Sequence, residues 1–224
     1  MMGWIRESPW LMQVLREARD VAGPGVAVAA GVLRSLAWSR LHGQSVLDWE
    51  RSWRVGASGQ AEPSLAMSGG NPVRAAQRDR PADIDVVFHD VDHPPGHDAL
   101  VARALAQRMP DVRWEVVNQA WVHTWHRDGH GHVMPALANL AQALATWPET
   151  ATAIAAWLDG SDGLCLLAPL GLDDLMALRL RHHPAVTTRA QFQARVDGKG
   201  WLARWPKLQV VPEAPGLALP SRDR

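Results

Sequence analysis

The sequence predicts an α/β fold in which helices flank a β-sheet. Segments of helical and strand period alternate along the chain, first as helix, strand, helix and then, after an insertion, as strand, helix, strand. The 224 residues suffice for one domain that buries about 70% of the surface of its unfolded chain. An apolar fraction of 47% provides the side chains for such a core.

The first unit is predicted from caps and apolar spacing. Ser8 followed by proline is a helix start, and the apolar residues after it recur at helical spacing to about Val21. The short apolar run 26–30 between glycine and proline turns predicts a buried strand. After Gly31, helical spacing returns over 32–42.

The second unit follows a long irregular segment. Residues 44–80 keep no period and collect Gly, Ser, Pro and Arg, so we expect a surface insertion. Strict alternation over 83–88 predicts a strand. A helix capped by Asp98 should end before Pro110, and residues 112–117 predict the next strand.

The second half of the chain predicts mostly helices. Thr146 and Glu149 fit a capping box that opens a helix through Leu158. The other expected elements are helices over 137–144, from Asp173 or Asp174 to Pro184, and over 188–196, a strand over 164–167, and a frayed tail over 211–224.

Composition excludes several classes of protein. The 23 basic and 23 acidic residues balance, which argues against a charged disordered tail and against a polybasic nucleic-acid-binding protein. Cys165 is the lone cysteine, so no intrachain disulfide forms. The apolar runs 25–33 and 163–172 are shorter than the roughly 18 residues of a membrane span. Without an uninterrupted apolar signal segment, we expect a soluble, cytoplasmic protein that does not bind membranes.

Two aspartates in the 83–88 strand carry the first functional signal. Asp83 and Asp85 share one face, with Cα atoms about 6 to 7 Å apart. Glu115 lies in the following strand, which a short strand-helix-strand connection places beside the first. Three carboxylates suit Mg²⁺ or Mn²⁺ that bridges substrate phosphates. An exposed Glu115 on an edge strand, paired with Arg113 or a neighbouring lysine, explains the sequence nearly as well.

The passage from strand to helix at Gly31 carries the second signal. Glycine lets the backbone approach a phosphate, and the N–H groups of the first helical turn favour anions. Arg34 and Ser35 would add side-chain donors to this turn.

Other polar residues leave two interpretations open. Asn118 and Gln119 follow the Glu115 strand and would read a base or ribose edge, or else form turn and cap hydrogen bonds. Asp90 and Asp92 lie among prolines, where a turn role is favoured. The histidines lie in loops without a matching cysteine pair, which argues against structural zinc.

Several blocks together resemble a bacterial nucleotidyltransferase-like family, distantly related to the DNA polymerase beta superfamily. The resemblance covers about residues 24–210, in the blocks AAGVLRSLAW, DIDVVFHD, WEVVNQAWVH, WPETATAIA, APLGLDDL and GWLARWPKL. It implies a small mixed β-sheet flanked by helices, with a helical C-terminal half. The expected organisation is one domain over 1–210, with a core at 24–123 that carries the insertion and a helical half at 124–210.

The resemblance also implies the roles of the site residues. Gly31 would be the phosphate-binding turn, with Asp83 and Asp85 as metal ligands and Glu115 as the third carboxylate. Val32 departs from the pattern, because Gly or Ser usually follows the turn glycine. The interval from Gly31 to Asp83 is also longer than usual, owing to the insertion.

The implied activity is transfer of a nucleoside monophosphate from a nucleoside triphosphate such as ATP to an acceptor hydroxyl, assisted by Mg²⁺ or Mn²⁺. The sequence does not identify the acceptor, and a nucleic acid stays among the candidates. The alternative is a binding module without turnover that docks a protein or RNA partner through its tryptophan-rich surface. In a third interpretation, a purely structural α/β protein, the carboxylates would lie apart.

Overall fold

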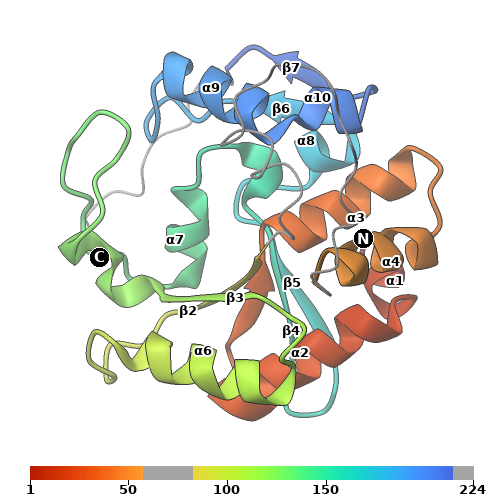
Figure 1. Ribbon diagram of the computed structural model, residues 1–224. Helices are drawn as coiled ribbons and strands as arrows, with labels where there is room; N and C mark the ends of the chain where they lie inside the picture. The colour runs from red at the N-terminus through yellow and green to blue at the C-terminus, as the bar shows by residue number, and fades with distance from the viewer. Residues whose placement is uncertain (58–82, 214–224) are drawn as a thin grey trace, which may run out of the picture.

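The computed structural model describes residues 1–57 and 83–213, whose strands form one main sheet and one small one (Figure 1). The main sheet has the order β3-β2-β1-β4-β5. Its β2 and β3 are parallel and the other neighbours are antiparallel, so the sheet is mixed, as predicted. Its strands are β1 (Ala27–Ala29), β2 (Ile84–Phe88), β3 (Trp114–Asn118), β4 (Ala155–Leu158) and β5 (Leu164–Leu167). The small sheet pairs β6 (Arg179–Arg181) with β7 (Gln209–Val211) in parallel.

Helices surround the main sheet, which confirms the α/β class. The α-helices are α1 (Met2–Arg6), α2 (Pro9–Ala22), α3 (Gly31–Leu41), α4 (Val46–Ala57), α6 (His97–Arg108), α7 (Leu140–Ala145), α8 (Asp173–Met176), α9 (Arg189–Lys199) and α10 (Trp201–Arg204). Short 3₁₀ helices cover Gln119–Thr124 and Thr150–Thr152. Among the described residues, none of these helices has the length and apolar character that a bilayer crossing requires.

The two faces of the main sheet differ in what covers them. Val28 and Val86 lie in the large core with residues of α2 and α6, which pack against each other (Figure 1). Ala29 and Val87 project to the opposite face, where Leu144 of α7 packs on them. Asp85 lies between Val86 and Ile84, so alternation places its side chain on this second face.

The predicted start of α2 is confirmed. The Ser8 hydroxyl oxygen accepts from the Leu11 amide at 3.1 Å, as an N-cap does. The same hydroxyl donates to Glu50 Oε2 at 2.7 Å. This bond gives the buried Glu50 carboxylate of α4 a hydrogen-bond donor.

The expected irregular insertion is wrong for its first part. Residues 46–57 form α4, whose first turn is capped by Ser45, and Trp49 and Trp53 pack into the core. Two tryptophans four residues apart lie on one face of a helix, and their burial stabilises α4. The polar residues between and around them obscure the helical period in the sequence. The remainder of the expected insertion, residues 58–80, lies outside the described residues.

The helix predicted over 146–158 is also wrong. Thr146 donates to the carbonyl of Ala143 instead of capping a new helix, and residues 155–158 form β4, which pairs with β1 and β5. A short run of alanine and large apolar residues fits a helix or a buried strand equally well. The strand is favoured because β4 provides hydrogen-bond partners for the edge of β1 that β2 does not cover.

Three helix boundaries also differ from expectation. The helix expected over 137–144 begins only at Leu140, after the N-cap Asn139. Helix α6 is capped by Gly96 in a left-handed conformation, with Asp98 in its first turn. The helix expected to reach Pro184 ends at Met176, because β6 follows it and pairs with β7. The helix expected over 188–196 is confirmed as α9, with a capping box formed by Thr188 and Gln191. Of the expected tail, 214–224 lies outside the described residues, while Val211 belongs to β7.

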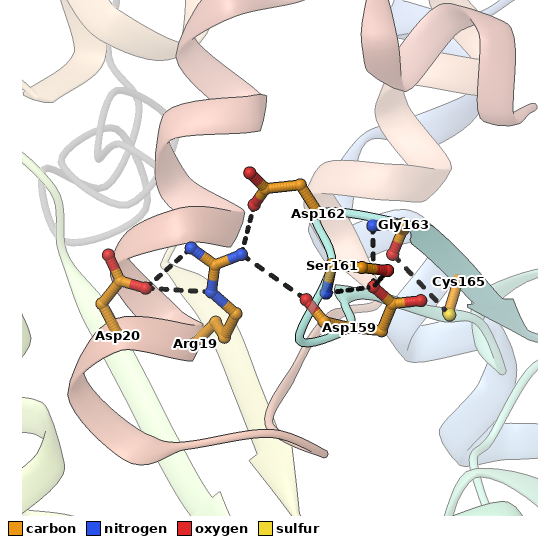
Figure 2. Close-up of polar contacts among 7 residues, drawn as sticks. All are labelled: Arg19, Asp20, Asp159, Ser161, Asp162, Gly163 and Cys165. Atoms are coloured by element: carbon orange, nitrogen blue, oxygen red, sulfur yellow. Dashed lines mark hydrogen bonds and ion pairs between the residues drawn. The ribbon is translucent and has the colours of Figure 1, made fainter.

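Figure 2 shows how the turn between β4 and β5 is held. Asp159 Oδ1 accepts hydrogen bonds from the amides of Ser161 and Gly163 and from the Ser161 hydroxyl, each at 2.8 Å. These bonds, the side-chain bond from Ser161 first, hold the pKa of Asp159 below its usual value. Arg19 of α2 pairs with Asp162, so the turn is also fixed to the helix beneath the sheet.

Candidate active site

Strand pairing brings the predicted carboxylates onto one face. Asp85 and Glu115 are register partners in the parallel pair β2–β3, so their side chains project to the same side of the sheet. Asp83 immediately precedes β2 and lies two residues from Asp85. Glu115 is exposed on an edge strand, whereas Asp85 is partly buried on the strand beside it. The prediction that the two acidic strands are neighbours is therefore confirmed.

The Gly31 turn lies next to Asp85. Ala29 pairs with Asp85 across β1–β2, and Ala30 turns the chain with a φ of 49° into the first residue of α3. The Gly31 amide then donates to Asp85 Oδ2 at 3.4 Å. A Cβ built on Gly31 would lie 3.6 Å from that oxygen, an ordinary van der Waals contact. The N-terminus of an eleven-residue helix thus points toward the acidic face.

Asp85 is electrostatically unusual. Burial, followed by the negative charge of Glu115, raises the pKa of Asp85 to about 6. The Gly31 N–H and the cationic Arg34 oppose this rise, while Asp83 adds to it. A buried carboxylate that holds a long hydrogen bond beside other acids is a suitable ligand for a hard cation, which would relieve the repulsion.

Asp83 is turned toward a different cation. Its Oδ1 lies 2.7 Å from a guanidinium nitrogen of Arg113, at the start of the neighbouring strand. Within residues 1–57 and 83–213, no three acidic, histidine or cysteine side chains converge closely enough to hold a metal ion. The donor set on this face, carboxylate oxygens alone, nevertheless fits Mg²⁺ or Mn²⁺ in chemical type.

Arg34 has a different environment from the one expected. Its guanidinium lies between Trp38 and Trp201, with its Cζ atom 5.0 and 4.4 Å from their ring centroids, and donates to Thr152 Oγ1 at 2.9 Å. Burial is the main cause that lowers its pKa to about 10, so it stays cationic at neutral pH. The helix turns this side chain into the core, so the structure places the predicted phosphate donor in a buried position.

Ser35, the other predicted side-chain donor to phosphate, is also buried. Its hydroxyl donates to the carbonyl of Val32 at 3.0 Å and accepts from the indole N–H groups of Trp49 and Trp53, both at 2.9 Å. These bonds use the oxygen to join α3 to α4. The predicted irregular insertion includes Trp49 and Trp53 and so misses this contact, although their spacing of four residues is compatible with one helix face.

Asn118 forms turn and cap hydrogen bonds, one of its two expected roles. Its Oδ1 accepts from the amides of Asp90 and Ala120, and its Nδ2 donates to the carbonyl of Asp90 at 2.7 Å. Asp90 has the expected turn role, because its Oδ1 accepts from the amides of Asp92 and His93. Gln119 is buried directly after β3.

The sequence missed a buried ionic network behind the Gly31 turn. Thr152, the acceptor for Arg34, donates to Glu149 Oε2 at 2.9 Å, and Arg195 donates to Glu149 Oε1 at 2.6 Å. Arg195 also lies over the Trp201 ring, at 5.5 Å from its centroid. Three segments far apart in the chain meet here, and no local spacing connects them.

Comparisons with known proteins agree with this arrangement. A family model described as nucleotidyltransferase matches residues 72–210, more than half of the chain. A solved NMR structure described as a CCA-adding enzyme head domain is similar in fold, with a TM-score of 0.64 and 23% identity. That match covers 93% of this chain and 92% of the other. No curated protein sequence matches the chain.

Proposed function

The chain belongs to a nucleotidyltransferase family, and from this we propose that it moves a nucleoside monophosphate from a nucleoside triphosphate to an acceptor hydroxyl. The observation that carries the proposal is the position of Asp85. This carboxylate is the register partner of Glu115 and also accepts from the Gly31 amide at the start of α3. An acidic pair beside a helix N-terminus combines ligands for a divalent cation with donors for phosphate oxygens.

The proposal divides the work between two parts of the site. Asp85 and Glu115, joined by Asp83, would hold Mg²⁺ or Mn²⁺, which supplies neutralisation of phosphate charge when it is bound. The amides of the first turn of α3 would orient the triphosphate, with the helix dipole favouring its negative charge. Because Arg34 and Ser35 are buried, backbone N–H groups carry more of this role than the sequence suggested.

The proton of the acceptor hydroxyl needs a base near the metal ligands. Glu115 is exposed on the edge strand β3, so its free oxygen is reachable from solvent. It would either accept that proton or remain a metal ligand. Replacement by glutamine separates these roles, because loss of a ligand weakens the metal titration whereas loss of a base lowers turnover alone.

Incubation with labelled nucleoside triphosphates and a cell extract tests the activity and also identifies the acceptor. The wild-type chain should label a discrete acceptor in a divalent-metal-dependent way, and Asp85→Ala should abolish this label. Asp111→Asn, which removes a negative charge from an exposed position, is the matched control and should label as the wild type does. Equal labelling by wild type and Asp85→Ala would contradict the proposal.

One observation favours a second candidate, a binding module without turnover. Arg34 donates to Thr152 and Ser35 bonds to Val32, Trp49 and Trp53, so both side chains are engaged inside the protein. Val32 also replaces the second small residue of the turn. Calorimetry with ATP, GTP, CTP and UTP, each with and without Mg²⁺, separates the two. Metal-dependent binding of a triphosphate supports the transferase, and its absence supports the module.

A further inference from the structure

Arg113 lies on the same face as the three carboxylates. The Ile84 amide donates to the carbonyl of Arg113 at 2.8 Å, so the segments that enter β2 and β3 are held side by side. Arg113 precedes Glu115 by two residues, and Asp83 precedes Asp85 by two. Alternation along paired strands therefore places the four side chains together.

The guanidinium of Arg113 binds Asp83 at a position from which it can be displaced. Arg113 Nη2 and Asp83 Oδ1 are 2.7 Å apart, and 44% of the Arg113 side chain and 36% of the Asp83 side chain are exposed. Ion pairs this open to solvent are weak, because water and salt screen them. A divalent cation that gains several carboxylate ligands at once can replace such a partner.

We propose that Arg113 is a latch on Asp83, which competes with the divalent cation for this carboxylate. In the metal-free protein the latch neutralises Asp83 and turns it away from Asp85 and Glu115. Asp83 completes the metal site only when the cation displaces the guanidinium. The inference rests on the proposed function, since it concerns the same acidic face.

Two observations support the latch. The acids at positions 83, 85 and 115 lie on neighbouring strand positions, where three like charges repel one another without a cation. An arginine that holds one of the three lowers this repulsion in the empty site. The described residues accordingly contain no preassembled group of three metal ligands, although the backbone places the three acids on one face.

Binding of Mn²⁺ alone, followed through the electron paramagnetic resonance signal of the free ion, tests the latch without nucleotide or turnover. Arg113→Gln should bind Mn²⁺ about two- to fivefold more tightly than wild type, the range expected when an exposed ion pair no longer competes. Arg113→Lys keeps a cation and should stay near the wild-type affinity. Arg103→Gln removes an exposed arginine of α6 and controls for net charge, so it should leave the Mn²⁺ affinity unchanged.

A double-mutant cycle shows whether the effect passes through Asp83. Asp83→Asn should weaken Mn²⁺ binding, and adding Arg113→Gln to it should give no further gain. Arg113→Met is a second neutral variant with a long apolar side chain, and it replaces the glutamine variant if that protein folds poorly.

The outcomes separate this inference from the proposed function. Wild-type protein that binds Mn²⁺ through Asp85, together with an unchanged affinity in Arg113→Gln and Arg113→Met, overturns the latch and leaves the metal site standing. The latch is also overturned if Arg113→Gln raises the Mn²⁺ affinity by the same factor in the wild-type and the Asp83→Asn background. Wild-type protein that binds no Mn²⁺ at millimolar concentration overturns the metal site itself, and the latch with it.

Discussion

The amide of Gly31 donates to the carboxylate of Asp85, which ties the first residue of α3 to the centre of the main sheet. The donor is a backbone group at the positive end of a helix, and the acceptor is an acid whose charged form is disfavoured by burial. The bond is long, at 3.4 Å, so it offsets only part of the cost of that charge. The charged form of Asp85 is therefore only partly compensated by its neighbours in the fold.

Asp85→Asn should stabilise the metal-free protein at neutral pH while abolishing transfer. The folded-state pKa of Asp85 is raised to about 6, so its contribution to stability is present below the unfolded pKa and is lost as the pH rises through 6. A shift of this size corresponds to about 3 kcal/mol. Denaturant unfolding at pH 8 without divalent metal should show the asparagine variant as the more stable, with the difference shrinking toward pH 4. Asp111→Asn should show no such dependence.

Mn²⁺ binding should weaken in acid through Asp85. A ligand carboxylate must lose its proton before it binds a cation, and Asp85 does so with a pKa of about 6. The apparent affinity should fall by close to tenfold per pH unit below about 6 and level off above about 7. Titrations from pH 5 to pH 8 measure this profile. An affinity that stays flat across the range would contradict the role of Asp85 as a ligand.

Trp201→Ala should strongly destabilise the fold. The Trp201 ring is buried, contacts Trp38, and carries Arg34 and Arg195 over its surface. Removal of a buried tryptophan side chain costs about 3 to 5 kcal/mol. Trp125→Ala is the control, because Trp125 is 66% exposed. Its removal should change the free energy of unfolding by less than about 0.5 kcal/mol. Chemical denaturation of the two variants gives the comparison.

Gly163→Ala should lower the melting temperature, whereas Gly160→Ala should not. A Cβ on Gly163 would lie 2.4 Å from Asp159 Oδ2, and moving that carboxylate breaks the hydrogen bonds that form the turn in Figure 2. A Cβ on Gly160, in the same turn, meets nothing within 4 Å. Thermal unfolding of both variants tests this pair. Equal melting temperatures would show that the turn adjusts without cost.

The sequence predicted the acidic face because a strand has a short and strict period. Alternation in 83–88 and the short connection to 112–117 were sufficient to place Asp85 beside Glu115. The burial of Arg34 and Ser35 depends on tryptophans from α10 and α4. The first lies far away in the chain, and the others lie in a segment without an obvious helical period. Local spacing contains no information on such contacts.

Strand β4 shows the same limit in the fold. Its residues fit a helix by composition, and pairing with β1 on one side and β5 on the other makes the extended form the stable one. The position of Asp83 is a related case. Spacing placed it correctly on the acidic face, whereas the rotation of its side chain toward Arg113 depends on a neighbouring strand.

The surroundings of Gly31 bear on why glycine stands at this position. The residue begins a right-handed helix, a methyl group would touch Asp85 without overlap, and alanine is the better helix former. Chain conformation alone thus gives no reason to prefer glycine. A bare Cα leaves the backbone at the start of α3 open to close approach, which is the property that the proposed phosphate-binding turn requires.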